Sequence, residues 1–97
     1  MASFIGLVSF TDQGIRNVKD TTKRAETVKQ MAAKAGVKLK DIYWTLGQYD
    51  ILSIWEAPDA ETLLPLLFAL GAQGNVRTQT LRAFNAEEIG KVISRMP

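Results

Sequence analysis

Two spacings of apolar residues recur along the 97-residue chain, and each predicts one kind of secondary structure. Short runs of strand-forming residues occupy 3–11, 37–46, 50–57 and 75–84. Apolar residues lie at helical spacing in 21–35, and the segment 57–74 is apolar around most of its circumference. The sequence therefore predicts the order strand, helix, strand, strand, helix, strand.

Individual residues refine where the predicted helices begin and whether they are regular. Asn85 and Glu88 have the spacing of a capping box ahead of a short amphipathic closing helix. Pro65 lies inside the second helix, so this helix is expected either to kink there or to begin its regular part near that residue. Residues 12–20 are expected to form a loop between the first strand and the first helix.

This order predicts an α+β fold of the ferredoxin-like βαββαβ type, with a four-stranded antiparallel sheet, helices on one face and an added C-terminal helix. The strands at 3–11 and 50–57 are apolar on both sides, so the face without helices also needs a cover. A second copy of the same sheet would provide it, which predicts a dimeric α+β barrel in a homodimer or a higher homo-oligomer. Leu66 or Phe68 is expected to contact another subunit.

Length and composition are those of one globular domain over residues 1–97, with 46% hydrophobic and 23% charged residues. The longest apolar segment is shorter than the ~20 residues of a membrane-spanning helix, and the N-terminal residues lack the pattern of a secretory leader. We therefore expect a cytoplasmic protein that does not contact a membrane.

The chain has no Cys and no His, which removes disulfides, thiolate metal sites and every mechanism that needs an imidazole. No clustered carboxylate motif suggests a metal, so we expect neither a metal nor a cofactor. The net charge is +2, without a concentrated basic stripe, and nucleic acid is not an expected partner. Basic residues around the first helix start do favour a small anionic ligand: Arg16, Lys19, Lys23 and Arg24.

The tetrapeptide Gly47-Gln48-Tyr49-Asp50 lies between two predicted strands and is expected to form a tight turn of two or three residues. Gly47 suits a positive φ angle in such a turn. Tyr49 and Asp50 fit either a structural role in the hairpin or contacts to a ligand. Trp44 and Trp55 share a face only if the turn has two residues, and either indole can belong to the core, an interface or a pocket.

Three segments together resemble the GYD domain family of small bacterial proteins: "VSFTDQGIRNVKDTTKRAE", "YWTLGQYDILSIWEAPD" and "ALGAQGNVRTQTLRAF". The family takes its name from a motif of the type Gly47-x-Tyr49-Asp50. The resemblance implies a dimeric α+β barrel and says little about activity. The segment "GQYDILSIWEA" alone is also similar to the effector-binding domains of Lrp/AsnC regulators, which bind small ligands between subunits, but the helix-turn-helix of those regulators is absent.

Two hypotheses of function remain open at this point. The first is a small homo-oligomeric ligand-binding or sensory protein, with a site formed by Trp44, Gln48, Tyr49, Asp50, Trp55 and Arg77, and with Arg16 as a further candidate. The second is a cofactor-independent, monooxygenase-like enzyme that acts on a small aromatic substrate. In such an enzyme Asp50, Tyr43 or Tyr49 would accept the proton, and the sequence does not identify a catalytic residue.

Overall fold

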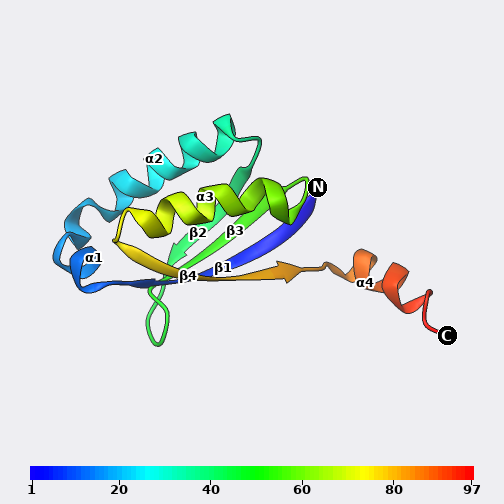
Figure 1. The fold of residues 1–97 in the computed structure, drawn as a ribbon. Helices are drawn as coiled ribbons and strands as arrows, with labels where there is room; N and C mark the ends of the chain where they lie inside the picture. Colours follow the sequence, from blue (N-terminus) through cyan, green and yellow to red (C-terminus); the bar gives the residue numbers. More distant parts are fainter.

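A computed structural model describes residues 1–97 (Figure 1). The chain forms four strands, four α-helices and one short 3-10 helix. In order these are β1 (Ala2–Phe10), α1 (Asp12–Arg16), η1 (Val18–Asp20), α2 (Thr21–Lys34), β2 (Lys38–Trp44), β3 (Ile51–Ala57), α3 (Ala60–Ala72), β4 (Val76–Ala83) and α4 (Ala86–Ile93).

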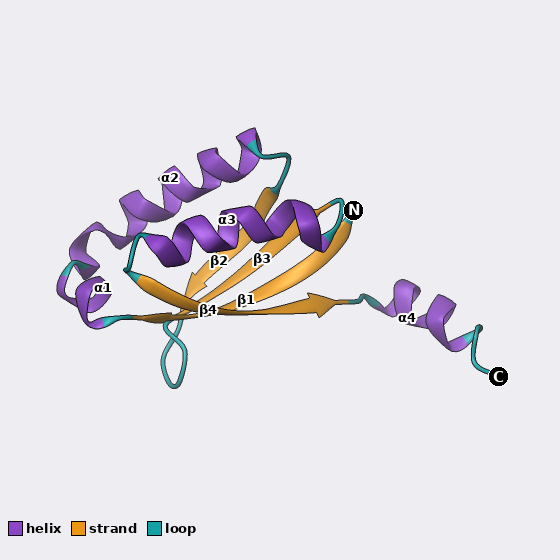
Figure 2. Cartoon of the chain, in the orientation of Figure 1, coloured by secondary structure: helices purple, strands orange, loops and turns teal.

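The four strands form one antiparallel sheet in the order β2-β3-β1-β4. Helices α2 and α3 lie side by side on one face of this sheet, and no element of the chain covers the other face (Figure 2). The predicted α+β fold with a ferredoxin-like arrangement is therefore confirmed. No helix is both long and apolar enough to cross a lipid bilayer.

The core lies between the sheet and the two helices. At its centre Trp55 from β3 and Leu63 from α3 are almost completely buried. Burial of one such side chain contributes about 1.5–3 kcal/mol to folding. Eight buried residues form the core cluster: Phe4, Ala32, Val37, Leu39, Trp55, Ala57, Leu63 and Leu66.

Leu66 belongs to this core and is only 6% exposed, so of the two residues expected to contact another subunit, Leu66 or Phe68, only Phe68 stays a prediction. The side of α3 that carries Leu66 turns toward the sheet, whereas Phe68 lies on the outer side and is 69% exposed. Pro65 does not delay or interrupt the regular part of the helix, which begins at Ala60. Asp59 caps that helix, and Pro65 in the second turn removes only one backbone donor.

Residues 12–20 form α1 and η1, where the sequence predicted a loop. Both helices are too short to show an apolar period. The Thr11 hydroxyl group accepts a hydrogen bond from the Gly14 amide and donates one to the Gly74 carbonyl. This threonine therefore caps α1 and ties it to the turn before β4 at the same time.

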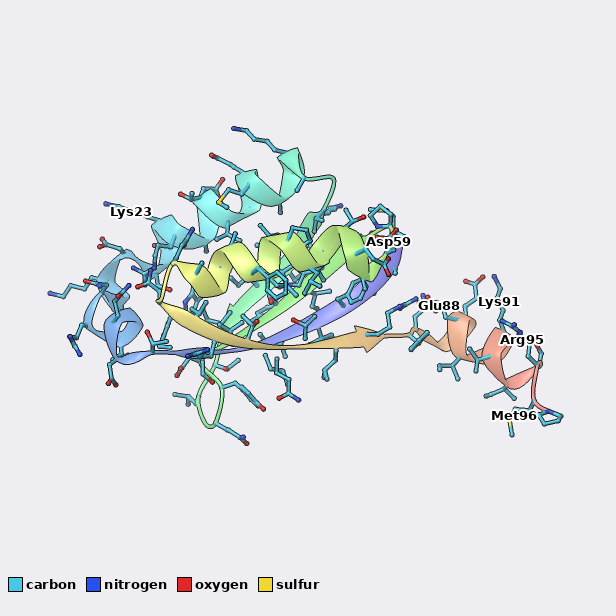
Figure 3. All side chains as sticks on the ribbon, in the orientation of Figure 1. Lys23, Asp59, Glu88, Lys91, Arg95 and Met96 are labelled. Atoms are coloured by element: carbon cyan, nitrogen blue, oxygen red, sulfur yellow. The ribbon has the colours of Figure 1, made fainter.

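The C-terminal helix α4 extends away from the rest of the chain, beyond the end of β4 (Figure 1). Its predicted capping box is present, with hydrogen bonds in both directions between Asn85 and Glu88. Glu88 and Lys91 lie on one side of this helix, and Met96, beyond its last residue, points to the opposite side (Figure 3). The large apolar side chains of this helix and of the residues after it are exposed, from 40% to 69%: Ile89, Val92, Ile93 and Met96.

Candidate functional site

The hairpin that carries the GYD motif has a longer loop than the sequence predicted. Strand β2 ends at Trp44 and β3 begins at Ile51, and the Thr45 amide donates a hydrogen bond to the Asp50 carbonyl. The Thr45 hydroxyl group also donates to the Tyr49 carbonyl at 2.6 Å. Gly47 has a φ angle of +99°, as expected for a glycine in a turn. The loop projects on the side of the sheet opposite the helices (Figure 1).

Asp50 fastens this loop to the neighbouring strand β1. Its carboxylate accepts a hydrogen bond of 2.8 Å from the Phe10 amide, and its own amide donates to the Val8 carbonyl at 2.8 Å. Val8 is the last residue of β1 that pairs with β3, and Phe10 lies beyond that pairing. One carboxylate oxygen is thus occupied by a backbone amide, which gives Asp50 a structural role in the hairpin.

Tyr49 reaches across the face of the sheet that the helices leave open. Its hydroxyl group donates a hydrogen bond of 2.8 Å to the side-chain oxygen of Gln79 on β4. Arg77 lies two residues before Gln79 on the same face, so the structure brings Tyr49 and Arg77 to one region of the sheet. Arg77 and Gln48 are both exposed.

The two tryptophans share the helix-covered face, and this settles their relative orientation. Trp44 pairs with Ile51, and Leu39 pairs with Trp55, on the same side of the sheet. Trp55 is buried, and its indole N–H donates to the Ser53 hydroxyl group at 2.8 Å. Trp44 lies on the edge strand, and its indole donates to the Thr21 hydroxyl group at 3.0 Å.

The candidate residues therefore divide between the two faces of the sheet and do not line one pocket. Trp44 and Trp55 lie under the helices, whereas Tyr49 and Arg77 lie on the open face. Gln48 lies in the loop, and Arg16 ends α1, where it is exposed. The three side chains proposed as proton acceptors, Tyr43, Tyr49 and Asp50, do not line the internal cavity described next.

A cavity of about 80 Å³ lies between the sheet and helices α2 and α3. Its wall is mainly apolar, with side chains such as Val8, Ile42 and Leu67. Two polar atoms among the lining residues are buried and have no hydrogen-bond partner, Nη2 of Arg24 and Oγ1 of Thr80. Of the residues that the sequence suggested for a ligand, only Trp55 and Arg24 line this cavity.

Arg24 stood out in the sequence only as one of several basic residues near a helix start, and Thr80 only as one residue on a face of the last strand. Neither pattern indicated a cavity, because the residues that line it come from strands far apart in the chain. The only indication in the sequence was the placement of Gly6, Ser53 and Thr80 within otherwise apolar or long-side-chain strands. Small residues at such positions leave space in a core.

Two carboxyl groups have clearly shifted pKa values, and both belong to helix caps. Hydrogen bonds from the side chain and the backbone of Thr62 lower the pKa of Asp59. The hydrogen bond from the Asn85 amide, assisted by the charge of Arg82, lowers the pKa of Glu88. No group of three or more carboxylates comes together as a metal site would require. Neither carboxyl group lines the cavity, and both serve helix caps.

Comparison with known proteins places the chain in a family. It matches the GYD domain over residues 4–93. It is 32% identical over 90 residues to a Thermus thermophilus protein named glutamine synthetase and cystathionine beta-lyase binding protein, and the match covers 92% of this chain and 95% of the relative. The crystal structure of TTHA0845, also from Thermus thermophilus, has the same fold, with a TM-score of 0.56, 23% identity, and coverage of 89% of this chain and 96% of that one. The chain belongs to the GYD domain family.

Proposed function

We propose that this chain is a small homodimeric regulatory protein that acts by docking onto another protein. The observation that carries the proposal is the amount of apolar surface that the chain leaves uncovered on three separate elements: the open sheet face, α4 and the outer side of α3. Monomeric soluble proteins rarely expose large contiguous apolar patches, and such patches mark interaction sites.

The homodimer is proposed to form through the open face of the sheet. The middle of this face is aliphatic, with Ile5 and Leu7 from β1 beside Leu52 and Ile54 from β3. Polar and charged side chains such as Glu56 lie further out. An apolar centre with a polar surround is the usual composition of an interface. A second sheet packed on it would exclude water from the aliphatic centre.

Helix α4 supports the same arrangement. It is anchored at its start, where Arg82 at the end of β4 forms an ion pair of 3.5 Å with Glu88. Its apolar side has no partner within its own chain, because the helix extends away from the sheet and from α2 and α3 (Figure 1). An extended amphipathic arm is stabilised when its apolar side packs against a second subunit.

The partner protein is proposed to dock on the outer side of α3. Leu64 and Phe68 are one helical turn apart on that side and are 45% and 69% exposed. This surface lies on the far side of the helices from the open sheet face, so it stays free when two sheets pack together. The Thermus relative is named for binding glutamine synthetase and cystathionine beta-lyase. We propose that this chain, too, has a metabolic enzyme of this kind as its partner.

Sedimentation velocity tests both parts of the proposal. The purified protein should sediment as a dimer, with twice the mass of the 10.7 kDa monomer. After addition of purified glutamine synthetase or cystathionine beta-lyase from the same organism, it should move with the enzyme. Phe68→Ser should remove the complex and keep the dimer, whereas Ile15→Ser, a change at an equally apolar exposed site on α1, should keep both. A monomer would contradict the dimer, and failure to move with either enzyme would contradict the proposed partner.

A further inference from the structure

The cavity under the helices exists because three small residues lie next to each other across the sheet. Ser53 on β3 pairs with Gly6 on β1, and Gly6 pairs with Thr80 on β4. All three face the helices, and larger helix-facing side chains precede and follow them on β1 (Phe4 and Val8) and on β3 (Ile51 and Trp55). A Cβ atom at Gly6 would overlap the Ser53 hydroxyl group. Protein cores are normally filled to the density of organic crystals, so a hollow of this size needs an explanation.

Polar groups of this cavity lack the partners that buried polar groups normally have. The Ser53 hydroxyl group is occupied, because it accepts from Trp55 and contacts the Gly6 carbonyl. Oγ1 of Thr80 and Nη2 of Arg24 are buried with no partner. An unsatisfied buried donor costs about 1–3 kcal/mol, and more when it is charged. The two atoms can therefore bind a polar molecule inside the cavity.

Arg24 determines the charge of that ligand. It is the only charged residue among those that line the cavity, and it forms no ion pair with a carboxylate of the chain. Its Nη1 atom donates to the Asn17 carbonyl at 2.9 Å, which holds the guanidinium group in place and leaves Nη2 free. A guanidinium group with one free edge is suited to a carboxylate.

We propose that the cavity binds a small monocarboxylate, with its carboxylate on Nη2 of Arg24 and its short apolar chain against the aliphatic wall. Thr80 supplies a further hydrogen bond to a polar atom of the ligand. The lining contains no Asp or Glu, so the ammonium group of a free amino acid would have no carboxylate partner there. At about 80 Å³ the cavity admits only a molecule of a few heavy atoms.

Ligand binding in the cavity goes beyond docking onto a partner protein and does not depend on it. The cavity lies inside one subunit, between its own sheet and helices. A failure of the enzyme-binding experiment would leave the ligand site unaffected, and the reverse also holds.

Propionate is a suitable probe, and its neutral isostere propionamide is the control for charge. Amide proton and nitrogen NMR shifts are followed while either compound is added at constant ionic strength. Propionate should shift the resonances of Arg24, Thr80 and neighbouring cavity residues with saturation, and propionamide should bind at least about tenfold more weakly, since the charge-assisted hydrogen bond is lost. Alanine should also bind more weakly than propionate.

Three variants separate a ligand site from a structural arginine. Arg24→Gln should weaken propionate about tenfold or more and remove the preference over propionamide. Lys23→Gln, on the adjacent residue that points away from the sheet, removes the same charge and should leave binding unchanged (Figure 3). Thr80→Val keeps the shape of the side chain and should weaken propionate about threefold. A thermal unfolding scan of each variant without ligand reports its folding separately.

Several results would overturn the proposal. Shifts that do not saturate, equal shifts with propionamide, or equal binding by Arg24→Gln would each show that Arg24 does not hold a carboxylate. Should Arg24→Gln fail to fold, the Thr80→Val titration and the comparison of propionate with propionamide on the parent protein still decide the question. Occupation of the cavity by water alone, at saturating propionate, would also overturn it.

Discussion

The two faces of the sheet are both apolar, yet they are covered in different ways. On the helix-covered face Phe4 and Trp55 lie under α2 and α3 and are 5% and 4% exposed. On the open face Leu81 is 42% exposed, and Ile5 and Ile54 are shielded only by their neighbours on the sheet. An apolar strand pattern therefore does not define the core. It shows that a face must be covered by some other element, and in this chain α2 and α3 cover only one of the two faces.

The centres of the two faces do not follow the simple rule that apolar residues are buried and polar residues are exposed. The covered face has Ser53, Gly6 and Thr80 at its centre, whereas the open face has aliphatic side chains such as Ile5 and Leu7. Polar groups cost free energy where they are buried, so the row under the helices is not explained by packing. This contrast underlies both proposals, association through the open face and a ligand under the covered one.

The strongest test of the covered face is Leu63→Ala on α3. Leu63 is 1% exposed, so loss of its side chain should reduce the free energy of unfolding by about 2–5 kcal/mol through lost burial and an added void. Leu64→Ala, on the adjacent outer-facing residue, should cost about 1 kcal/mol or less. Urea unfolding followed by circular dichroism measures both. Equal losses at the two positions would show that α3 does not bury one side as described.

A charge introduced in the middle of the open face tests whether the sheet of a second subunit packs there. Ile54→Lys should weaken the dimer by roughly 3 kcal/mol, on the order of 100-fold in dissociation constant, because a buried ammonium group would lie in an apolar interface. The fold of the subunit should persist, since Ile54 does not belong to its core cluster. Ile15→Lys, on exposed α1, is the control. Sedimentation equilibrium gives the dissociation constants, and unchanged association of Ile54→Lys would exclude the open face as the interface.

Substitutions in the GYD loop should change the free energy of unfolding less, because each removes or weakens one hydrogen bond. Asp50 bonds to β1 and Tyr49 bonds to β4. Asp50→Asn keeps the shape but removes the charge that accepts from the Phe10 amide, and should cost about 1 kcal/mol. Tyr49→Phe removes the exposed hydrogen bond to Gln79 and should cost about 0.5 kcal/mol. Urea unfolding again measures both. A larger loss for Tyr49→Phe would mean that the open face, rather than β1, holds the loop.

The smallest expected change in stability concerns Asp59, the residue that caps the start of α3 on the covered face. The two hydrogen bonds from Thr62 lower the pKa of Asp59 below its ordinary value of 3.8. A carboxyl group whose folded pKa is depressed stabilises the fold above its unfolded pKa and loses that contribution as the pH falls through the folded pKa. The stability difference between the parent and Asp59→Asn should therefore be constant near neutral pH and shrink below about pH 4.

Urea unfolding of both proteins from about pH 6 to pH 2 checks this expectation. Glu88, the other carboxyl group with a lowered pKa, titrates in the parent and the variant alike, so its contribution cancels in the difference. A difference that stays constant down to the lowest pH would show that the Asp59 cap does not depend on ionisation.

Much of the fold follows from local sequence. Four strands, two long helices and the closing helix were predicted within a few residues, because alternating or helical apolar spacing and caps such as Asn85 with Glu88 act over a few positions. The positive φ of Gly47 is local in the same sense. The apolar character of both faces of β1 and β3 was also visible, and with it the need for a second cover.

The site was not predictable in this way. The loop length, the common face of Trp44 and Trp55, and the capping of α1 by Thr11 depend on contacts between segments far apart in the chain. The cavity depends on them most strongly, since only the pairing of β3, β1 and β4 places Ser53, Gly6 and Thr80 in one row beneath the helices. Strand register is fixed by the packing of the whole sheet, and a shift by one residue would turn each of these side chains to the other face. Sequence thus determined the four strands, the two long helices and the closing helix, and tertiary structure decided which of their residues meet.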